Sequence, residues 1–275
     1  MSKIAYDPIK DKFSDIIKGS RTLRTLFYYL LDLFFLRSWH VRRLIKKYGQ
    51  PFEKKGEWKL LDAGSGFGQY DRFLLSKFDN VVVHSIDVKE DYLQDSMEYF
   101  KPEIEQKKIQ FYKSDLLNYS SDEKFNMIIC VDVLEHIEED VKVMRNLADV
   151  LKEGGYFIMH SPSHYSEEDA DKDDSFVDEH ARPGYSKREI FKKIESVGLD
   201  PVKIHYTYGF WGHKAWILSV KWPMIWFDKF GLMAAFILLL YYPIVLPFCL
   251  LMNTADLYAK NKKGNGVYAL ARKAK

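Results

Sequence analysis

Three glycines and a neighbouring aspartate are the first residues whose types and spacing suggest chemistry. Gly64, Gly66 and Gly68 form a GxGxG loop after a short apolar run, and Asp62 stands at the end of that run. Glycine lets the backbone turn sharply and approach a ligand closely. The loop lacks the GxGxxG spacing with which dinucleotide-binding proteins hold a pyrophosphate, and the Asp62 carboxylate would repel a phosphate. The loop therefore predicts a ligand that carries positive charge.

Two more aspartates follow the next two apolar runs. Asp87 ends the second run, where a carboxylate can accept hydrogen bonds from both ribose hydroxyls. Asp115 follows the third run, where a short acceptor can reach an adenine amino group. Each aspartate could instead cap the helix after it, which is a common role for this residue. Three acids at successive positions favour ligand contact for the set, and the capping alternative stays open for Asp115 above all.

The apolar runs alternate with longer segments of helical spacing. This alternation is typical of a parallel sheet with helices on both faces, in which ligands collect at the carboxyl ends of the strands. A capping-box pattern at Ser186 and a glycine at Gly198 predict one further helix between them. We expect seven strands, at Lys59–Leu61, Val81–Ile86, Ile109–Lys113, Met127–Val131, Tyr156–His160, Val202–Tyr208 and Val267–Ala271.

The segments around these residues resemble a known family. LLDAGSGFGQY, SIDV, KSDLL, IICVDVLEHIEED and LKEGGYFIMHSPS are similar, in this order, to the motifs of class I S-adenosylmethionine-dependent methyltransferases. The resemblance covers about half of the chain. It implies an α/β, Rossmann-like, seven-stranded methyltransferase sheet with helices on both faces, N-terminal helices and an apolar helical insertion before the last strand.

The resemblance also implies a cofactor site for S-adenosylmethionine, with S-adenosylhomocysteine as the product. The three glycines are expected to pass under the methionine part of the cofactor, Asp87 to hold the ribose and Asp115 to lie beside the adenine. The complete predicted cofactor site is Asp62, Gly64, Ser65, Gly66, Gly68, Asp87, Val88, Asp115, Leu116 and Val131.

The segment after the fourth strand should lie beside the transferable methyl group. His136 in this segment is our first candidate for a general base, since an imidazole titrates near neutral pH. The alternative is a structural histidine at the start of a helix. A third reading is a metal site of Asp132, Glu135 and His136, because some ubiquinone-pathway O-methyltransferases bind a metal with a similar segment. We predict that no metal is bound.

An acid-rich stretch from Ser166 to Glu179 is expected to form a solvated lid over the substrate mouth. The residues just after it lie between this lid and the next helix. His180, Arg182 and Tyr185 are therefore candidate substrate contacts, and His180 is our second candidate catalytic residue.

A long apolar run, Gly231 to Met252, precedes the last expected strand. As one helix it would reach roughly 33 Å, enough to cross the hydrocarbon core of a bilayer. The strands on either side belong to one sheet, however, so the chain must leave and return on the same side. Pro243 and Pro247 are expected to break the run into a bent hairpin that enters one leaflet.

A second greasy stretch, Leu23 to Leu36, becomes basic in the residues that follow and resembles an interfacial amphipathic helix. Tryptophans and lysines also flank the apolar run, as at a membrane interface. These are Trp211, Trp216, Trp222, Trp226, Lys221, Lys229, Lys260, Lys262 and Lys263. The alternative for both stretches is a buried helical cap or a dimer interface in a soluble enzyme.

Composition sets further bounds. With 41 lysines and arginines against 39 aspartates and glutamates, net charge gives no argument for nucleic-acid binding. The two cysteines, Cys130 and Cys249, lack the spacing of a metal site or a redox pair, which favours a reducing, cytoplasm-facing compartment. We expect an N-terminal helical segment (1–56), the cofactor domain (57–208), the apolar insertion (209–263) and the final strand (264–275).

These expectations combine into one functional hypothesis. The chain should be a cytoplasmic methyltransferase, peripheral or monotopic on the inner face of the membrane, that methylates a lipid, quinone, isoprenoid or other hydrophobic acceptor, preferably on oxygen. The first alternative is a soluble small-molecule methyltransferase whose apolar segment forms a substrate chamber or a homodimer interface. The second is a catalytically idle cofactor-fold protein that acts as an assembly partner.

Overall fold

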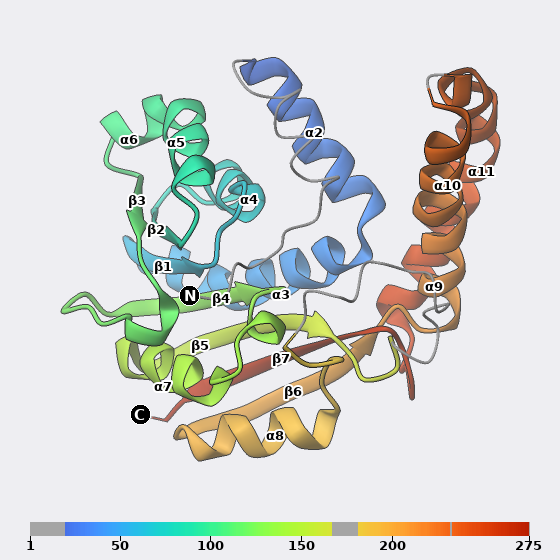
Figure 1. The fold of residues 1–275 in the computed structure, drawn as a ribbon. Helices are drawn as coiled ribbons and strands as arrows, with labels where there is room; N and C mark the ends of the chain where they lie inside the picture. The colour runs from blue at the N-terminus through green and yellow to red at the C-terminus, as the bar shows by residue number, and fades with distance from the viewer. Residues whose placement is uncertain (1–19, 167–180, 232, 275) are drawn as a thin grey trace.

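Seven strands form one mixed sheet in the order β3-β2-β1-β4-β5-β7-β6 (Figure 1). The computed structural model describes residues 20–166, 181–231 and 233–274. Only β7 runs antiparallel to its neighbours, β5 and β6, so the sheet has the seven-stranded, Rossmann-like arrangement that the sequence predicts. The strands are β1 (Trp58–Ala63), β2 (Val81–Asp87), β3 (Ile109–Lys113), β4 (Phe125–Val131), β5 (Leu151–Pro162), β6 (Leu199–Thr207) and β7 (Gly266–Lys273).

Apolar residues on alternating strand positions build a core on each face of this sheet. Leu60 and Leu61 of β1 are both fully buried, but they belong to different clusters because successive side chains point to opposite faces. Helices α3 (Leu36–Glu53), α4 (Gln69–Lys77) and α5 (Glu90–Tyr99) cover one face. Helices α7 (Asp140–Val150) and α8 (Lys187–Ser196) cover the other. The short helix α6 (Lys101–Glu105) follows α5.

The helix predicted between Ser186 and Gly198 is confirmed as α8. The Ser186 hydroxyl accepts a hydrogen bond from the Glu189 backbone N–H at 3.1 Å, as an N-cap does. Gly198 follows the helix with a φ of +75°, a conformation that glycine adopts without strain. Local capping chemistry therefore fixes both ends of this element.

The N-terminal greasy stretch forms helix α2 (Arg21–Phe34), which meets α3 at Phe35. Phe35 is extended (φ −96°, ψ 107°), so the two helices are separate elements that diverge at this residue (Figure 1). Leu26 and Tyr29 on α2 are more than half exposed. An amphipathic helix is confirmed here, and its apolar residues remain partly uncovered within the described part of the chain.

The insertion between β6 and β7 is a helical hairpin that projects away from the sheet (Figure 1). The outgoing arm consists of α9 (Phe210–Trp216), the π-helical segment η3 (Ile217–Lys221) and α10 (Trp222–Phe230). The returning arm is α11 (Met233–Tyr258). Since β6 and β7 pair along their length, the chain leaves and returns on one side, as the sequence predicts.

The position of the bend in this hairpin was predicted wrongly. Pro243 and Pro247 lie inside the continuous helix α11, and the chain reverses near Gly231, whose φ of +54° suits glycine. A proline removes one helical hydrogen bond, but its fixed φ is compatible with a helix. Packing keeps α11 intact across this region, because the hydroxyls of Tyr241 and Tyr242 donate to backbone carbonyls of η3, both at 2.9 Å.

Candidate active site

The three glycines form the loop between β1 and α4, and all three have positive φ angles, of 83°, 52° and 73°. A Cβ atom on Gly64 would lie 2.4 Å from a Val133 methyl group, and one on Gly68 would lie 2.9 Å from the Phe100 ring. Among the described residues, a Cβ atom on Gly66 would meet nothing within 4 Å. Packing therefore explains Gly64 and Gly68, whereas Gly66 faces open space in which a ligand can approach the backbone.

Asp87 at the end of β2 lies beside this open space. Its Oδ2 accepts a hydrogen bond from the Gly66 N–H at 2.8 Å, and its Oδ1 accepts one from the Lys89 N–H at 2.9 Å. A carboxylate can accept more hydrogen bonds than these two, so Asp87 can also receive ligand hydroxyls. Val88 is half exposed next to it, and Val131 is half-buried at the end of β4.

Asp62 and Ser65 carry buried polar atoms whose partners are missing within the described part of the chain. Asp62 is 1% exposed, and neither its Oδ2 nor the Ser65 Oγ makes a hydrogen bond there. Burial raises the pKa of Asp62 well above its usual value, and the nearby Asp71 and Asp87 raise it further. A cationic ligand at the loop would favour the ionised form of Asp62. These groups fit the methionine portion of the predicted cofactor.

Asp115 performs the capping role that the sequence left open. Its Oδ1 accepts a hydrogen bond from the Leu117 N–H at 2.9 Å, and its Oδ2 accepts one from the Asn118 side chain at 3.2 Å. It thereby caps the 3₁₀ turn η1 (Leu116–Asn118), in which Leu116 is buried. A contact between Asp115 and adenine stays a prediction.

A polar network joins the ends of β4, β5 and β6. Asp132 follows β4 with a φ of +53°, a conformation that strains a residue with a side chain. Its Oδ1 lies 2.7 Å from His160 Nδ1, and its Oδ2 lies 2.6 Å from an Arg37 guanidinium nitrogen. The Thr207 hydroxyl lies 3.1 Å from His160 Nε2. This network fixes the segment that should border the acceptor.

Sequence reasoning missed most of this network. His160 and Thr207 were predicted only as strand residues, and Arg37 is simply the first of the basic residues that follow the greasy stretch. A signal was present, because Asp132, His160 and Thr207 are polar residues at the carboxyl ends of three strands. The ion pair between Arg37 and Asp132 could not be inferred, because the two residues lie far apart in the sequence.

Glu135 and His136 lie in the 3₁₀ turn η2 (Leu134–His136), which follows β4. Glu135 is 1% exposed, and it accepts a hydrogen bond from the Ser161 hydroxyl at 2.6 Å. Burial, with the negative charge of Asp132, raises the pKa of Glu135 to about 8. His136 is half-buried at the end of this turn, and its place beside the methyl group and its role as a base stay predictions.

The metal alternative gains no support from the described residues. Within ranges 20–166, 181–231 and 233–274, no three histidine, cysteine, aspartate or glutamate side chains are grouped as metal ligands. The Asp132 carboxylate is directed to Arg37 and His160, whereas Glu135 is directed to Ser161. Two of the three candidate ligands, Asp132 and Glu135, are therefore engaged by different protein groups.

The residues after the acid-rich stretch were expected to contact substrate, but those that the structure describes contact the protein itself. That stretch and His180 lie largely or wholly outside the described residues. Arg182 donates to the backbone carbonyls of Ile137 and Glu138, at 2.7 and 2.9 Å, and pairs with Asp140. Tyr185 is fully buried and donates its hydroxyl to Asp140 at 2.7 Å. A buried carboxylate requires such partners, so both residues support α7 instead of lining an open site.

Helix α2 packs directly on the glycine loop. The Arg24 guanidinium donates to the carbonyl of Phe67, between Gly66 and Gly68, at 3.1 Å, and to the Ser96 hydroxyl at 2.9 Å. The Tyr28 hydroxyl also donates to the Phe67 carbonyl. The N-terminal segment therefore shapes the cofactor loop in addition to carrying exposed apolar residues.

Comparison with known proteins agrees with this geometry. Residues 54–198 match a family model described as a methyltransferase domain. Two ubiquinone biosynthesis O-methyltransferases, from two strains of Rickettsia bellii, are each 25% identical over 116 residues, which is 42% of this chain and 47% of the relative. The match thus spans about half the length of these relatives.

Solved structures share the fold at low sequence identity. A phosphoethanolamine N-methyltransferase 2 from Haemonchus contortus, in complex with S-adenosyl-L-methionine, is 20% identical with a TM-score of 0.61, covering 96% of this chain and 60% of that one. An S-adenosylmethionine-dependent methyltransferase from Clostridium acetobutylicum is 14% identical with a TM-score of 0.56, covering 91% of this chain and 99% of that one.

Proposed function

This chain belongs to the class I S-adenosylmethionine-dependent methyltransferases, and we propose that it methylates a hydrophobic acceptor taken from a membrane surface. The acceptor class is a lipid, an isoprenoid quinone or a related molecule, and oxygen is the preferred acceptor atom. The enzyme would be bound to the cytoplasmic face of the membrane without crossing it. The observation that carries this proposal is an exposed apolar hairpin rooted at the edge of the sheet that holds the cofactor site.

The cofactor supplies an electrophilic methyl group, and the residues of the loop bind and orient it. Gly66 would give backbone access, Asp87 would accept hydrogen bonds from the ribose, and the buried Asp62 and Ser65 atoms would hold the charged methionine portion. Because methyl transfer is an in-line displacement, alignment of donor and acceptor is the main task of the protein. His136 is the proposed base that removes the proton of a hydroxyl acceptor.

The hairpin begins at the carboxyl end of β6, next to the polar network at the strand ends. Helix α9 starts at Phe210, just after β6 ends at Thr207, and Thr207 itself contacts His160 of the strand-end network. Near the other root of the hairpin, Asn265 Nδ2 lies 3.1 Å from His213 Nδ1. An acceptor that travels along the hairpin would therefore arrive at the cofactor edge of the sheet.

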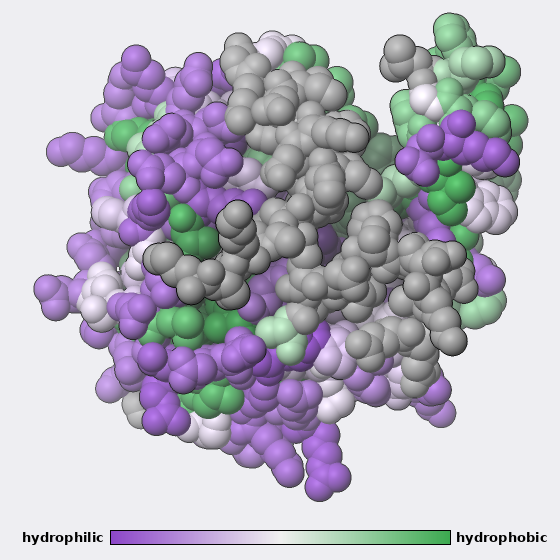
Figure 2. Space-filling view, in the orientation of Figure 1, coloured by the Kyte–Doolittle hydropathy of each residue, from purple (hydrophilic) through white to green (hydrophobic). Residues whose placement is uncertain are grey.

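The hairpin exposes more apolar surface than the exterior of an ordinary soluble protein. Helix α11 has a mean hydropathy of 2.3 over its most apolar window, of which 11% is buried. Phe236, Leu239 and Leu240 are each more than 70% exposed. Figure 2 displays apolar residues over much of the hairpin, in contrast to the largely hydrophilic surface of the sheet domain. Large exposed apolar patches mark membrane or protein contacts.

Two features favour one-sided membrane attachment over a full crossing. The paired strands β6 and β7 hold both ends of the hairpin on one side, and the outgoing arm carries Lys214, Lys221 and Lys229. A lysine at the centre of a bilayer is unfavourable by about 3 kcal/mol, whereas near the interface its ammonium reaches water. The ubiquinone-pathway relatives, named for the synthesis of a membrane-soluble quinone, support the same class of acceptor.

A label-transfer experiment tests the proposal. The full chain is incubated with S-adenosylmethionine labelled on the methyl group, together with vesicles that contain mixed phospholipids and demethylated quinone precursors. We expect label in the organic phase, and we expect His136→Ala to lower the rate by about a hundredfold while cofactor affinity is unchanged. Label confined to water-soluble acceptors would contradict the hydrophobic acceptor.

The alternatives give different outcomes in the same set of measurements. A soluble enzyme that covers α11 with a second copy would remain dimeric in size-exclusion chromatography and would not float with vesicles. An idle assembly partner would bind the cofactor weakly or not at all in calorimetry, and would transfer no label. Vesicle flotation by a catalytically active chain is the result expected here.

A further inference from the structure

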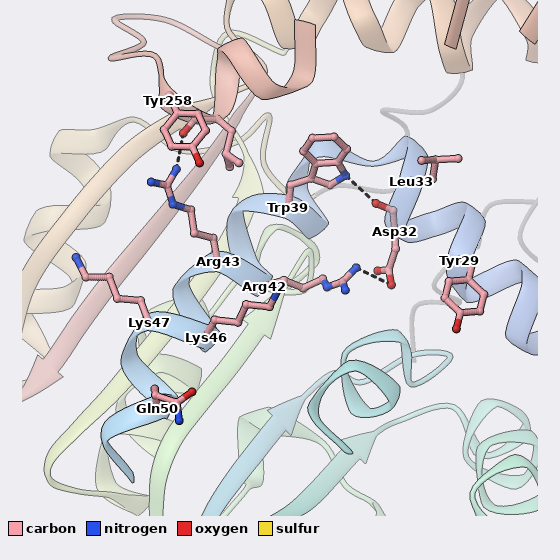
Figure 3. A pocket seen from close by; sticks show the side chains of 11 residues that line it. Tyr29, Asp32, Leu33, Trp39, Arg42, Arg43, Lys46, Lys47, Gln50 and Tyr258 are labelled. Atoms are coloured by element: carbon pink, nitrogen blue, oxygen red, sulfur yellow. Dashed lines mark hydrogen bonds and ion pairs between the residues drawn. The ribbon is translucent and has the colours of Figure 1, made fainter. Parts of the chain in front are cut away.

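An open groove runs along the outer side of α3, between the roots of the two projecting apolar elements (Figure 3). It encloses about 820 Å³. Tyr29 and Leu33 of α2 form one wall, whereas Leu257 and Tyr258 at the end of α11 form the other. The groove therefore connects two regions that the sequence places far apart.

Four cations from α3 line the groove. Arg42 and Lys46 are four residues apart on the helix, as are Arg43 and Lys47, so they form two adjacent rows that both line the groove (Figure 3). The only carboxylate among the described lining residues is Asp32, and its Oδ2 is paired with the Arg42 guanidinium at 2.7 Å. The groove thus carries a clear excess of positive charge.

Apart from the Arg42–Asp32 pair, the cations of the groove are crowded rather than neutralised. Burial, together with the charges of Arg42 and Lys77, lowers the pKa of Lys46. Arg43 is stacked over the Tyr258 ring at 4.3 Å and donates to the Leu257 carbonyl at 3.1 Å, so its position is fixed by the end of α11. An anion in the groove would relieve the repulsion among these side chains.

The walls indicate which anion fits. Tyr29 is 57% exposed and Tyr258 is 68% exposed, and each presents an apolar ring with a polar hydroxyl. Beyond them lie the exposed apolar residues of α2 and α11, such as Leu26 and Leu251. A ligand with a negatively charged head and apolar chains would match a cationic groove that is bordered by apolar side chains.

We propose that this groove binds the phosphate of an anionic phospholipid headgroup, with the acyl chains directed along the apolar faces of α2 and α11. The inference rests on the membrane attachment proposed above and adds the lipid class and the residues that select it. A nucleic acid is a poorer match, because the walls are apolar and the chain as a whole has a formal net charge of only +2.

Vesicle flotation of the full chain tests this site. One set of vesicles contains only phosphatidylcholine, and the other also contains phosphatidylglycerol. Wild-type protein should bind both and prefer the anionic vesicles. Lys46→Ala with Lys47→Ala should weaken binding to the anionic vesicles by roughly ten- to thirtyfold, because each lysine near an anionic surface contributes about a fivefold factor. Binding to neutral vesicles and to S-adenosylmethionine should not change.

A matched control removes the same charge elsewhere. Lys101 on α6 and Lys192 on α8 are exposed and lie outside the groove, so Lys101→Ala with Lys192→Ala should keep the anionic preference. Equal losses in both double variants would overturn the inference in favour of diffuse charge, as would an unchanged groove variant. Tighter binding of the groove to duplex DNA than to anionic vesicles would also overturn it. If the wild type binds neither kind of vesicle, the membrane attachment itself fails.

Discussion

The strand-end site and the hairpin are both rich in apolar residues, yet they bury them to opposite degrees. Leu60, Leu61 and Ile129 beneath the glycine loop are completely buried. Leu240 and Phe236 of α11 are 74% and 76% exposed. An apolar residue is covered within the chain only where a second layer packs on it, and α11 has such a layer on one side only.

The charged residues of the two regions also differ in burial. Around the site, carboxylates such as Asp62 and Glu135 are held in the interior. In the hairpin the apolar residues face outward, while the lysines of the outgoing arm remain able to reach water. The buried carboxylates therefore fit a charged ligand inside the fold, and the outward apolar residues fit the proposed contact of the hairpin with an apolar phase outside it. Four variants test this division, beginning with the largest expected effect.

Exposed leucines of the hairpin should be needed for membrane binding but not for folding. Leu239→Ser with Leu240→Ser removes two side chains that are 71% and 74% exposed, whereas Leu238 is kept because it is buried. Burial of a leucine contributes about 1.5–3 kcal/mol, so vesicle binding should weaken by a hundredfold or more. The melting temperature should stay within about two degrees. A large loss of stability, with vesicle binding retained, would mean that protein covers this face.

The buried Glu135 should make the stability of the folded chain depend on pH. Its pKa in the folded state, about 8, lies above its value in the unfolded chain. Its contribution to stability is therefore complete at acidic pH and is lost as the pH rises through about 8. Glu135→Gln keeps an acceptor for Ser161 and removes the titration. Urea unfolding at pH 8.5 should find the variant more stable by up to about 4 kcal/mol, with little difference at pH 5.

The control for this pH experiment is Glu153→Gln, since Glu153 is exposed near the start of β5. Its stability profile should follow that of the wild type across the whole range. If Glu135→Gln also gives a curve parallel to the wild type, then Glu135 titrates normally. The contrast between a buried polar site and an outward apolar hairpin would then lose one of its supports.

Asp87 should be required for the cofactor and dispensable for the fold. Asp87→Ala removes the acceptor for the ribose and releases the Gly66 N–H. Charge-assisted hydrogen bonds contribute about 1.5–3 kcal/mol each, so affinity for S-adenosylmethionine should fall by about a hundredfold or more in calorimetry. Asp200→Ala, at an exposed position, serves as the control. Affinity that stays within a fewfold would contradict the ribose assignment.

Gly66 should matter to the ligand more than to the protein. An alanine Cβ at this position would contact none of the described residues, so the expected cost is the strain of a positive φ, about 1 kcal/mol. Gly198→Ala carries similar strain with equally open surroundings, at a place far from the site in the sequence. Both variants should lose similar stability, and only Gly66→Ala should weaken cofactor binding, by roughly tenfold. Equal binding by the two variants would mean that no ligand approaches Gly66 closely.

Much of the fold followed from local patterns. The strand positions, the Ser186 cap and the glycine loop are each encoded within a few neighbouring residues, and all are confirmed. The bend of the hairpin was missed because a proline stops a helix only when packing does not maintain it. The reversal near Gly231 depends on where the outgoing arm ends, which periodicity in the apolar run does not reveal.

The parts of the site that escaped prediction are contacts over long sequence distances. Arg24 of α2 meets Phe67 of the loop, and Arg37 meets Asp132 across the strand ends. No local pattern marks such pairs, because each partner alone reads as a surface charge or an ordinary loop residue. The capping role of Asp115, in contrast, is a local feature, and the sequence predicted it as an alternative.

A crystal structure of the chain with S-adenosylhomocysteine tests the central claim most directly. The account predicts the nucleoside at the carboxyl ends of β1 and β2, with its ribose hydroxyls on Asp87 and its methionine portion over Gly64, Gly66 and Gly68. It further predicts that the cofactor sulfur faces the side of the site from which the hairpin projects. A ligand bound elsewhere, or a nucleotide phosphate seated in the glycine loop, would contradict the account.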